Sequence, residues 1–443
     1  MLSRFFVDQF LPMNILDPVQ VLKYLGLTVV YLLAMRFCTR RVQSNEIDSF
    51  LVLNVSIAFT MTLLTLYLVK SEIRPDDFIH IAFLTATFYL TVLFLSIFLK
   101  FETLKAGVKT LARTALLEDG LRDPIIVSSF MVLAPITLFF ASAISQSGEG
   151  SSADIIRGSS FLRLFGEGLS PFFAYYALSA LIASGRVRNG VMLFFIFAAG
   201  PVLGSKAAII STFVNFFMIR GLYKPEMRLK QALKWLPLLP VALATMTVPL
   251  LLTGRTIDVA ALSLGARFFL SGDIYFWLFV AARPESFYAY YDWPTYLLHP
   301  FTALLGFRGY DLPLGAALMS HYLGYANLGG PNPHAPALGL VLFKGNLLLA
   351  TLFCAVMGGA VVALRYGALR ALAITTLPPF LRSAPFIICF QAAPMLFLDF
   401  GTTERLMLST LIFAVLYFFL GVLAELGKRA RSLPNVTERP RFA

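Results

Sequence analysis

Residues Arg308–Gly345 read RGYDLPLGAALMSHYLGYANLGGPNPHAPALGLVLFKG. The stretch holds two of the four histidines in the chain, and it passes through GGPNPHAP into the apolar run ALGLVLF. Glycine and proline gather where a chain turns, so GGPNPHAP is expected to be a constrained loop rather than a helix. His334 therefore stands where a fixed polar loop enters an apolar segment.

The composition around this stretch is that of a membrane protein. Of the 443 residues, 58% are hydrophobic and 14% are charged, whereas soluble proteins carry about 25% charged residues. Apolar runs of about 20 residues recur along the chain, and each is long enough to cross a bilayer as a helix that satisfies its own backbone. The sequence predicts an all-α polytopic membrane protein in which residues 1–443 form a single helical bundle.

We expect about 11 transmembrane helices, within a range of about 10–12. The expected spans are residues 20–38, 48–69, 78–99, 125–145, 169–185, 190–204, 206–220, 235–252, 337–363, 384–400 and 405–425.

Charge sets the expected orientation of these spans. The net charge is +12, and most Lys and Arg residues fall in alternate loops, which the positive-inside rule assigns to the cytoplasm. The basic tail 428–443 belongs to the same side, and the loop 253–336 lies on the opposite, periplasmic side. The excess of cations therefore indicates membrane lipids rather than nucleic acid as partners.

Several kinds of chemistry lack their sequence motifs. The three cysteines have no CxxC spacing, and the chain has no HExxH motif and no Walker A loop. We therefore expect no metal site and no cofactor. The N-terminus lacks the apolar core of a cleavable signal peptide.

The loop 253–336 is the longest connection, and long ordered connections are usually functional. Within it, residues 266–282 read ARFFLSGDIYFWLFVAA, which fits a twelfth span, a re-entrant element or an interfacial helix. The interfacial helix is preferred, because a further span would place residues 283–333 in the cytoplasm and reverse the later charge pattern.

Eight cations break the positive-inside trend on the outer side. Any one of them is explained by anchoring to lipid headgroups, but together they favour an anionic ligand, for which phosphate or pyrophosphate is the natural candidate. Internal pairs remain an alternative, with Glu167 for Arg163 and with Asp273 for Arg267. The eight are Arg157, Arg163, Lys206, Arg255, Arg267, Arg283, Arg308 and Lys344.

His334 is the expected general base, because a neutral imidazole near a helix N-terminus is able to accept a proton from a hydroxyl while the helix favours a nearby phosphate. Asn332 is expected to orient this histidine or to bind glycan. The aromatic segment 284–301 fits a membrane-interface belt or a platform that stacks on sugar rings. The candidate glycan contacts are Asp273, Tyr291, Trp293, His321 and Asn332.

Four segments give the chain a resemblance to the bacterial O-antigen and exopolysaccharide repeat-unit polymerases of the Wzy type. They are RGSSFLRLFGEG, GPVLGSKAA, GARFFLSGD and GGPNPHAPALG. The resemblance implies a metal-independent glycosyltransferase of the GT-C type in the bacterial inner membrane. It also implies undecaprenyl-pyrophosphate-linked oligosaccharides as substrates and a polysaccharide chain-length regulator as a partner.

The resemblance gives roles to the candidate residues. His334 activates the acceptor hydroxyl, while Arg267 and four further cations stabilise the pyrophosphate leaving group. Two alternatives stay open, an O-antigen ligase that transfers polymer to the lipid A core and a flippase for lipid-linked oligosaccharides. The four further cations are Arg157, Arg163, Lys206 and Arg308.

Overall fold

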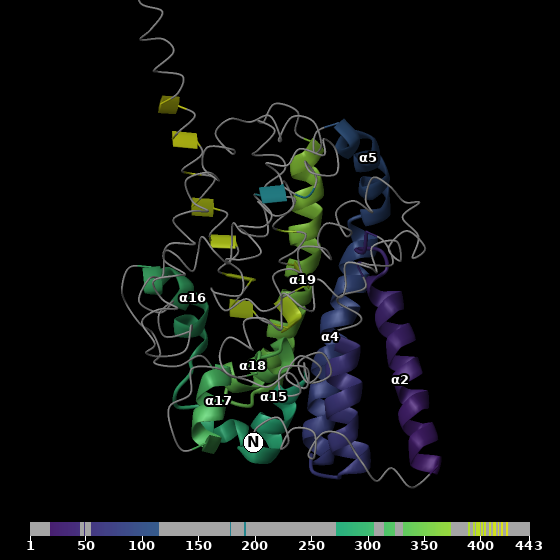
Figure 1. Cartoon of the computed structure of the whole chain (residues 1–443), viewed down its shortest axis with the longest axis vertical. Coiled ribbons are helices and arrows are strands. Elements are labelled where there is room, and N and C mark those ends of the chain that lie inside the picture. Colours follow the sequence, from purple (N-terminus) through teal and green to yellow (C-terminus); the bar gives the residue numbers. More distant parts are fainter. Residues whose placement is uncertain are drawn as a thin grey trace, which may run out of the picture.

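The computed structural model describes residues 18–44, 48, 55–114, 178, 190–191, 272–304, 314–323 and 331–373, with separate positions between 389 and 423. Helices make up its regular structure, and these residues include no strand (Figure 1). In chain order the elements are α2 (Pro18–Thr39), η1 (Ile57–Val69), α4 (Pro75–Phe98), α5 (Phe101–Thr114), α15 (Asp273–Phe276), η6 (Trp277–Ala281), η7 (Pro284–Phe287), α16 (Trp293–Leu304), α17 (Leu314–Leu323), α18 (Ala335–Leu342) and α19 (Leu347–Ala373).

Three of the described helices, α2, α4 and α19, are long and apolar enough to cross a membrane. Their positions agree with the predicted spans at 20–38 and 78–99 and with the later part of the span at 337–363. The expected spans between 125 and 252 lie outside the described residues, apart from single helical positions at 178, 190 and 191.

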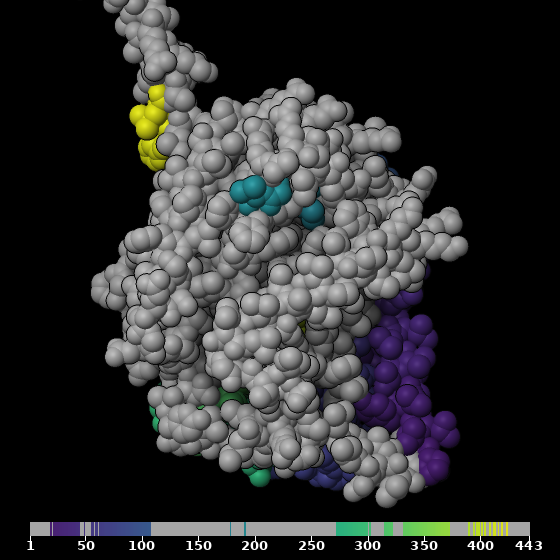
Figure 2. Space-filling model, viewed as in Figure 1, coloured from purple at the N-terminus to yellow at the C-terminus, as the bar shows by residue number. Residues whose placement is uncertain are grey.

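Helix α2 lies at one edge of the molecule and presents an apolar face to the outside (Figure 2). Side chains on this face are half exposed or more, although α2 is apolar enough to cross a membrane. Such a face is costly in water and favourable in hydrocarbon. The exposed residues include Leu22, Leu25, Val29, Val30, Leu33 and Phe37.

The helices α4 and α19 pack along each other and form the axis of the described part (Figure 1). Gly358 lets the two backbones approach, because a Cβ at this position would collide with the carbonyl oxygen of Phe88. Small residues permit this kind of close helix contact within membranes. The rings of Phe88 and Tyr89 then pack against Phe397, with ring centroids 5.0 Å and 5.6 Å apart.

The predicted span 337–363 is wrong as a single helix. The chain forms α18, turns over residues 343–346, and starts α19 at Leu347. Lys344 and Gly345 both have positive φ, at 54° and 76°, which is the left-handed conformation that reverses a chain. Residues 344–346 read KGN, and this charged residue followed by Gly and Asn is a turn signal that the predicted span 337–363 disregards. The two helices contact each other, and Gly339 of α18 lies against Phe353 and Ala350 of α19.

The helix η1 has π-helical hydrogen bonding and joins α2 through hydroxyl groups. The side chain of Tyr24 on α2 hydrogen bonds with Thr60 and Thr65, and Thr60 donates in turn to the Ser56 carbonyl. A threonine hydroxyl that donates to a backbone carbonyl of its own helix is satisfied locally, so it does not remain without a partner in apolar surroundings. The predicted span at 48–69 is thus helical from residue 55, and residues 49–54 lie outside the described part.

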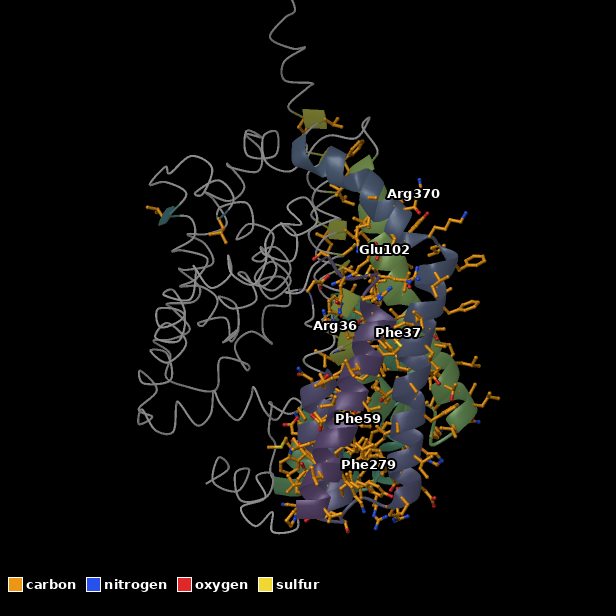
Figure 3. The ribbon with its side chains drawn as sticks, turned by 90° about the vertical axis from the view of Figure 1, so that its right-hand side faces the viewer. Arg36, Phe37, Phe59, Glu102, Phe279 and Arg370 are labelled. Carbon is orange, nitrogen blue, oxygen red and sulfur yellow. The ribbon has the colours of Figure 1, made fainter. Side chains whose placement is uncertain are left out.

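The described helices share two ends. At one end, burial and the nearby carboxylates of Glu285 and Asp77 raise the pKa of the Tyr288 phenol, whose oxygen also lies beside Gly345. The start of α4, the segment around η7 and the α18–α19 turn therefore lie together at this end of the described helices. Figure 3 shows Glu102 and Arg370 towards the opposite end, where α5 and the end of α19 meet.

A buried ion pair closes that opposite end. Both side chains are 0% exposed, and Arg365 donates to the two carboxylate oxygens of Asp48 at 2.7 Å and 2.8 Å. The same guanidinium donates to the Val42 carbonyl at 2.7 Å, and the Ser44 N–H donates to Asp48 at 2.7 Å. The ammonium of Lys105 binds the Gln43 carbonyl at 2.9 Å. The described residues between 42 and 48, which follow α2, are thus bound by Arg365 of α19 and by Lys105 of α5.

Arg365 follows the predicted span 337–363, so the positive-inside rule counts it among the cations of a cytoplasmic loop, and this geometry corrects that interpretation. Arg365 lies within α19, and its charge is neutralised by Asp48. In contrast, Arg40 and Lys100 are exposed just beyond the ends of α2 and α4, as expected for cations outside the apolar region, and Arg36 and Arg370 are exposed in the last turns of their helices.

We expect Gly358→Ala to destabilise the protein, because the added methyl group forces α4 and α19 apart. The cost is about 1–3 kcal/mol, as for overpacking elsewhere. Gly367→Ala is the control on the same helix, because nothing lies within 4 Å of its added Cβ and alanine favours the helix. Thermal unfolding in detergent compares the two, and equal stabilities would contradict close packing at Gly358.

Arg365→Met is expected to cost about 3–5 kcal/mol, because it leaves the buried Asp48 carboxylate without its guanidinium partner. The double variant Asp48→Leu with Arg365→Met removes both charges and should recover most of that loss. Arg370→Met is the control, since Arg370 is exposed and stacks on Tyr366 of its own helix. Chemical unfolding in detergent gives the free energy of unfolding of the wild type and the three variants. An Arg365→Met variant as stable as the wild type would show that the ion pair contributes nothing.

Candidate functional site

His334 occupies the end of the Gly- and Pro-rich loop, where the structure places the start of a helix. It is the N-cap residue of α18, its backbone is extended with φ −59° and ψ 149°, and its carbonyl accepts the N–H of Leu338 at 2.8 Å. Pro336 lies in the first turn, where the missing N–H of proline costs nothing. Gly315 of α17 packs directly on the Pro331 carbonyl and fixes the loop from the other side.

The His334 side chain is 1% exposed and lies between two aromatic rings. Its Nδ1 is 3.4 Å from the Tyr275 hydroxyl, and the Tyr275 ring meets the imidazole edge to face at 5.4 Å. The Phe397 ring lies 5.7 Å away on another side. Enclosure of this kind holds an imidazole in one orientation.

Tyr275 belongs to the segment that sequence reasoning expected to be an interfacial helix. Residues 274–279 are all buried, in the short helices α15 and η6. An interfacial helix would expose one face to water, so this expectation is wrong for the described part of the segment. Gly272 makes the burial feasible, because a Cβ there would strike the Ala58 carbonyl of the π-helical segment.

The polar candidates near His334 differ in accessibility. Asn332 lies two residues before His334 and is exposed, so its amide is free to face a ligand. Asp273 is half-buried at the start of α15, two residues before Tyr275. His321 is exposed in the last turn of α17, with its ring 5.6 Å from that of Phe287. Gly315 of α17 contacts Pro331, which lies three residues before His334, so α17 packs against the loop that carries His334.

The aromatic candidates separate into one buried and one exposed residue. Tyr291 is 4% exposed and packs edge to face against Tyr296, so it lies within the core. Trp293 is 50% exposed at the start of α16. Tyr290, which sequence reasoning did not single out, is 72% exposed. The exposed pair Tyr290 and Trp293 is therefore the stronger candidate for stacking on a sugar ring.

The cation candidates for pyrophosphate binding lie outside the described residues. This applies to Arg157, Arg163, Lys206, Arg267 and Arg308. Two other outer-side cations are described: Arg283 is exposed at the N-cap of η7, and Lys344 is exposed in the left-handed turn before α19. Lys344 thus lies a helix length of about 12 Å from His334, since α18 has eight residues.

The described residues offer no group of three or more His, Cys, Asp or Glu side chains that would hold a metal ion. The three cysteines are free. The arrangement that remains is an enclosed imidazole, a phenol on its Nδ1 and a helix N-terminus, which suits proton transfer. Tyr275 was missed because it stands in a dense aromatic run, where nothing in the sequence separates a packing residue from a histidine partner.

In comparisons with known proteins, no protein-family model, no curated protein and no solved structure matches the chain.

Proposed function

We propose that this chain is an integral-membrane glycosyltransferase that polymerises lipid-linked oligosaccharide repeat units. The growing glycan is transferred from one polyprenyl-pyrophosphate carrier to the terminal sugar of the next lipid-linked unit. The reaction takes place at the periplasmic face of the bacterial inner membrane, and the leaving group is polyprenyl pyrophosphate.

The contact between His334 and Tyr275 is the observation that carries the proposal. Two of the four segments that give the resemblance, GARFFLSGD and GGPNPHAPALG, are far apart in the sequence, yet a residue just after the first contacts a residue within the second. Tyr275 follows the first segment by two residues, and His334 lies within the second. A catalytic centre requires such convergence of residues from different elements.

The break between α18 and α19 also supports the proposal. The short helix α18 runs back along α19, so its N-terminus lies about 12 Å inside the end at which α19 begins. Non-helical backbone at such a depth is tolerated where it is enclosed by protein or lines a polar cavity. The partial positive charge of a helix N-terminus favours an anion beside His334.

The roles follow from the chemistry. Expulsion of a pyrophosphate places negative charge on its oxygens, which arginine side chains stabilise without a metal. Arg267 and the other outer cations take this role. The acceptor hydroxyl loses its proton to an imidazole nitrogen of His334, and Asn332 and the exposed ring of Trp293 contact the glycan. Access of the acceptor requires the enclosure around His334 to open on substrate binding.

The break between α18 and α19 also fits one alternative function, that of a transporter. Broken helices with ionisable residues deep in the bundle are typical of membrane transporters, so a flippase for lipid-linked oligosaccharides is the second candidate. An O-antigen ligase shares the chemistry of the polymerase but uses lipid A core as acceptor.

Deletion of the gene distinguishes these functions on a gel of cell-surface glycan. Loss of a polymerase leaves single repeat units on the core and removes the ladder of longer chains. Loss of a ligase leaves the core without any repeat unit, and loss of a flippase retains the units inside the cell. Either of the last two outcomes would overturn the polymerase proposal.

Replacement of His334 tests its role as the base. We expect His334→Gln, which retains hydrogen-bonding capacity but has no basic nitrogen, to reduce polymer formation about 10²–10⁴-fold. His80→Ala is the control, because His80 is a half-buried histidine in the first turns of α4 whose described neighbour is Asp77. Ladder length and membrane content are measured together, and full-length ladders from a stable His334→Gln protein would exclude His334 as the base.

A further inference from the structure

The interior around His334 contains more hydroxyl groups than the proposed reaction uses. The hydroxyls of Tyr31 on α2 and Tyr89 on α4 are buried, and neither has a hydrogen-bond partner in the structure. Thr85 lies one helical turn before Tyr89 and has a buried, unpartnered hydroxyl as well. Burying a hydroxyl without a partner is unfavourable, so several in one region need an explanation.

These hydroxyls belong to one cluster. Tyr31, Tyr89 and Tyr275 lie near enough to each other for their phenols to interact electrostatically in all three pairs. Tyr275 in turn reaches Nδ1 of His334. The Phe397 ring is shared, since it contacts both Tyr89 and His334. The cluster therefore draws side chains from α2, α4, α15 and the N-cap of α18.

We propose that Tyr31, Tyr89, Tyr275 and His334 form a buried proton-transfer network, which we name the tyrosine network. In it, Tyr275 is a positioning residue that sets which ring nitrogen of His334 carries the proton. The hydroxyls of Tyr89 and Tyr31 hold water that receives the proton taken from the acceptor. This proposal rests on the proposed function for the origin of that proton.

The proton balance of the network is simple. The acceptor O–H bond breaks and its proton binds Nε2 of His334, while the oxygen bonds to the sugar carbon released from pyrophosphate. The Nδ1 proton of His334 passes to the Tyr275 oxygen as the Tyr275 proton passes to water held by Tyr89 and Tyr31. Each tyrosine ends with one proton, water gains one, and nothing is oxidised or reduced.

The surroundings of His334 favour this role for Tyr275. The titratable groups that face the Tyr275–His334 pair in the described part are Tyr31, Tyr89 and Cys354, from α2, α4 and α19. None of these is charged at neutral pH. The hydrogen bond to Tyr275 is therefore the described contact that is able to select which ring nitrogen of His334 carries the proton.

The first test reads the histidine directly and needs no enzymatic turnover. The full-length protein in lipid nanodiscs is labelled with ¹⁵N in its four histidines, and the His334→Gln spectrum assigns the His334 signals. Protonated and unprotonated ring nitrogens give widely separated signals. We expect Tyr275→Phe to move the proton between Nδ1 and Nε2, whereas Tyr296→Phe, which removes another buried phenol, leaves it in place. An unchanged His334 spectrum in Tyr275→Phe would overturn the proposal.

The second test measures polymer formation and thermal stability. Tyr275→Phe should lower turnover roughly 10- to 100-fold without changing KM, as when a group that orients a histidine is removed. Tyr89→Phe should also lower turnover. If the Tyr89 hydroxyl is only an orphaned group, Tyr89→Phe instead raises the melting temperature and keeps full activity, which contradicts the network.

The two tests separate failure of the network from failure of the function. If the wild-type protein makes no polymer but Tyr275→Phe still relocates the His334 proton, the polymerase proposal is wrong and control of His334 by Tyr275 is upheld. If polymer forms normally in Tyr275→Phe and Tyr89→Phe, the network is wrong and the polymerase proposal stands.

Discussion

The close approach of α4 and α19 at Gly358 is the contact on which the described architecture depends. Because the two backbones touch there, Phe88 and Tyr89 are brought against the Phe397 ring, and α18 finds a surface on the neighbouring turns of α19. Every element that surrounds His334 packs on this axis or on a neighbour of it. Neither α15 nor α18 is long enough to be stable alone, so both depend on tertiary packing.

The surroundings of His334 combine features that are individually costly. An imidazole, a phenol and the end of a helix are enclosed among aromatic rings, where each polar group must be satisfied locally. Natural proteins keep such arrangements mainly where they serve a function, because an apolar core would be more stable. Asn332, two residues away, is exposed, so the loop that carries His334 reaches the surface.

The sequence predicted helical membrane character well because length and apolar content decide it. It placed α2 and α4 within a few residues, and it placed His334 at the start of an apolar helix. The predicted span 337–363 missed the turn at Lys344–Gly345, because the apolar residues on both sides outweighed the turn signal of Lys344, Gly345 and Asn346 between them. The sequence also could not separate Tyr291, which is buried, from Tyr290, which is exposed, since burial in an aromatic run depends on tertiary contacts. The pairing of Arg365 with Asp48 could not be predicted from the sequence either, because it is a tertiary contact between residues 317 positions apart.

That separation has a consequence for biogenesis. A ribosome adds about 5–20 residues per second, so Arg365 emerges roughly 16–60 s after Asp48. During this interval the first helices are already made while a carboxylate destined for the interior has no counter-ion. The ion pair that joins α19 to the connection after α2 therefore forms only once α19 has been made, so this contact does not stabilise the first helices while they are inserted without α19.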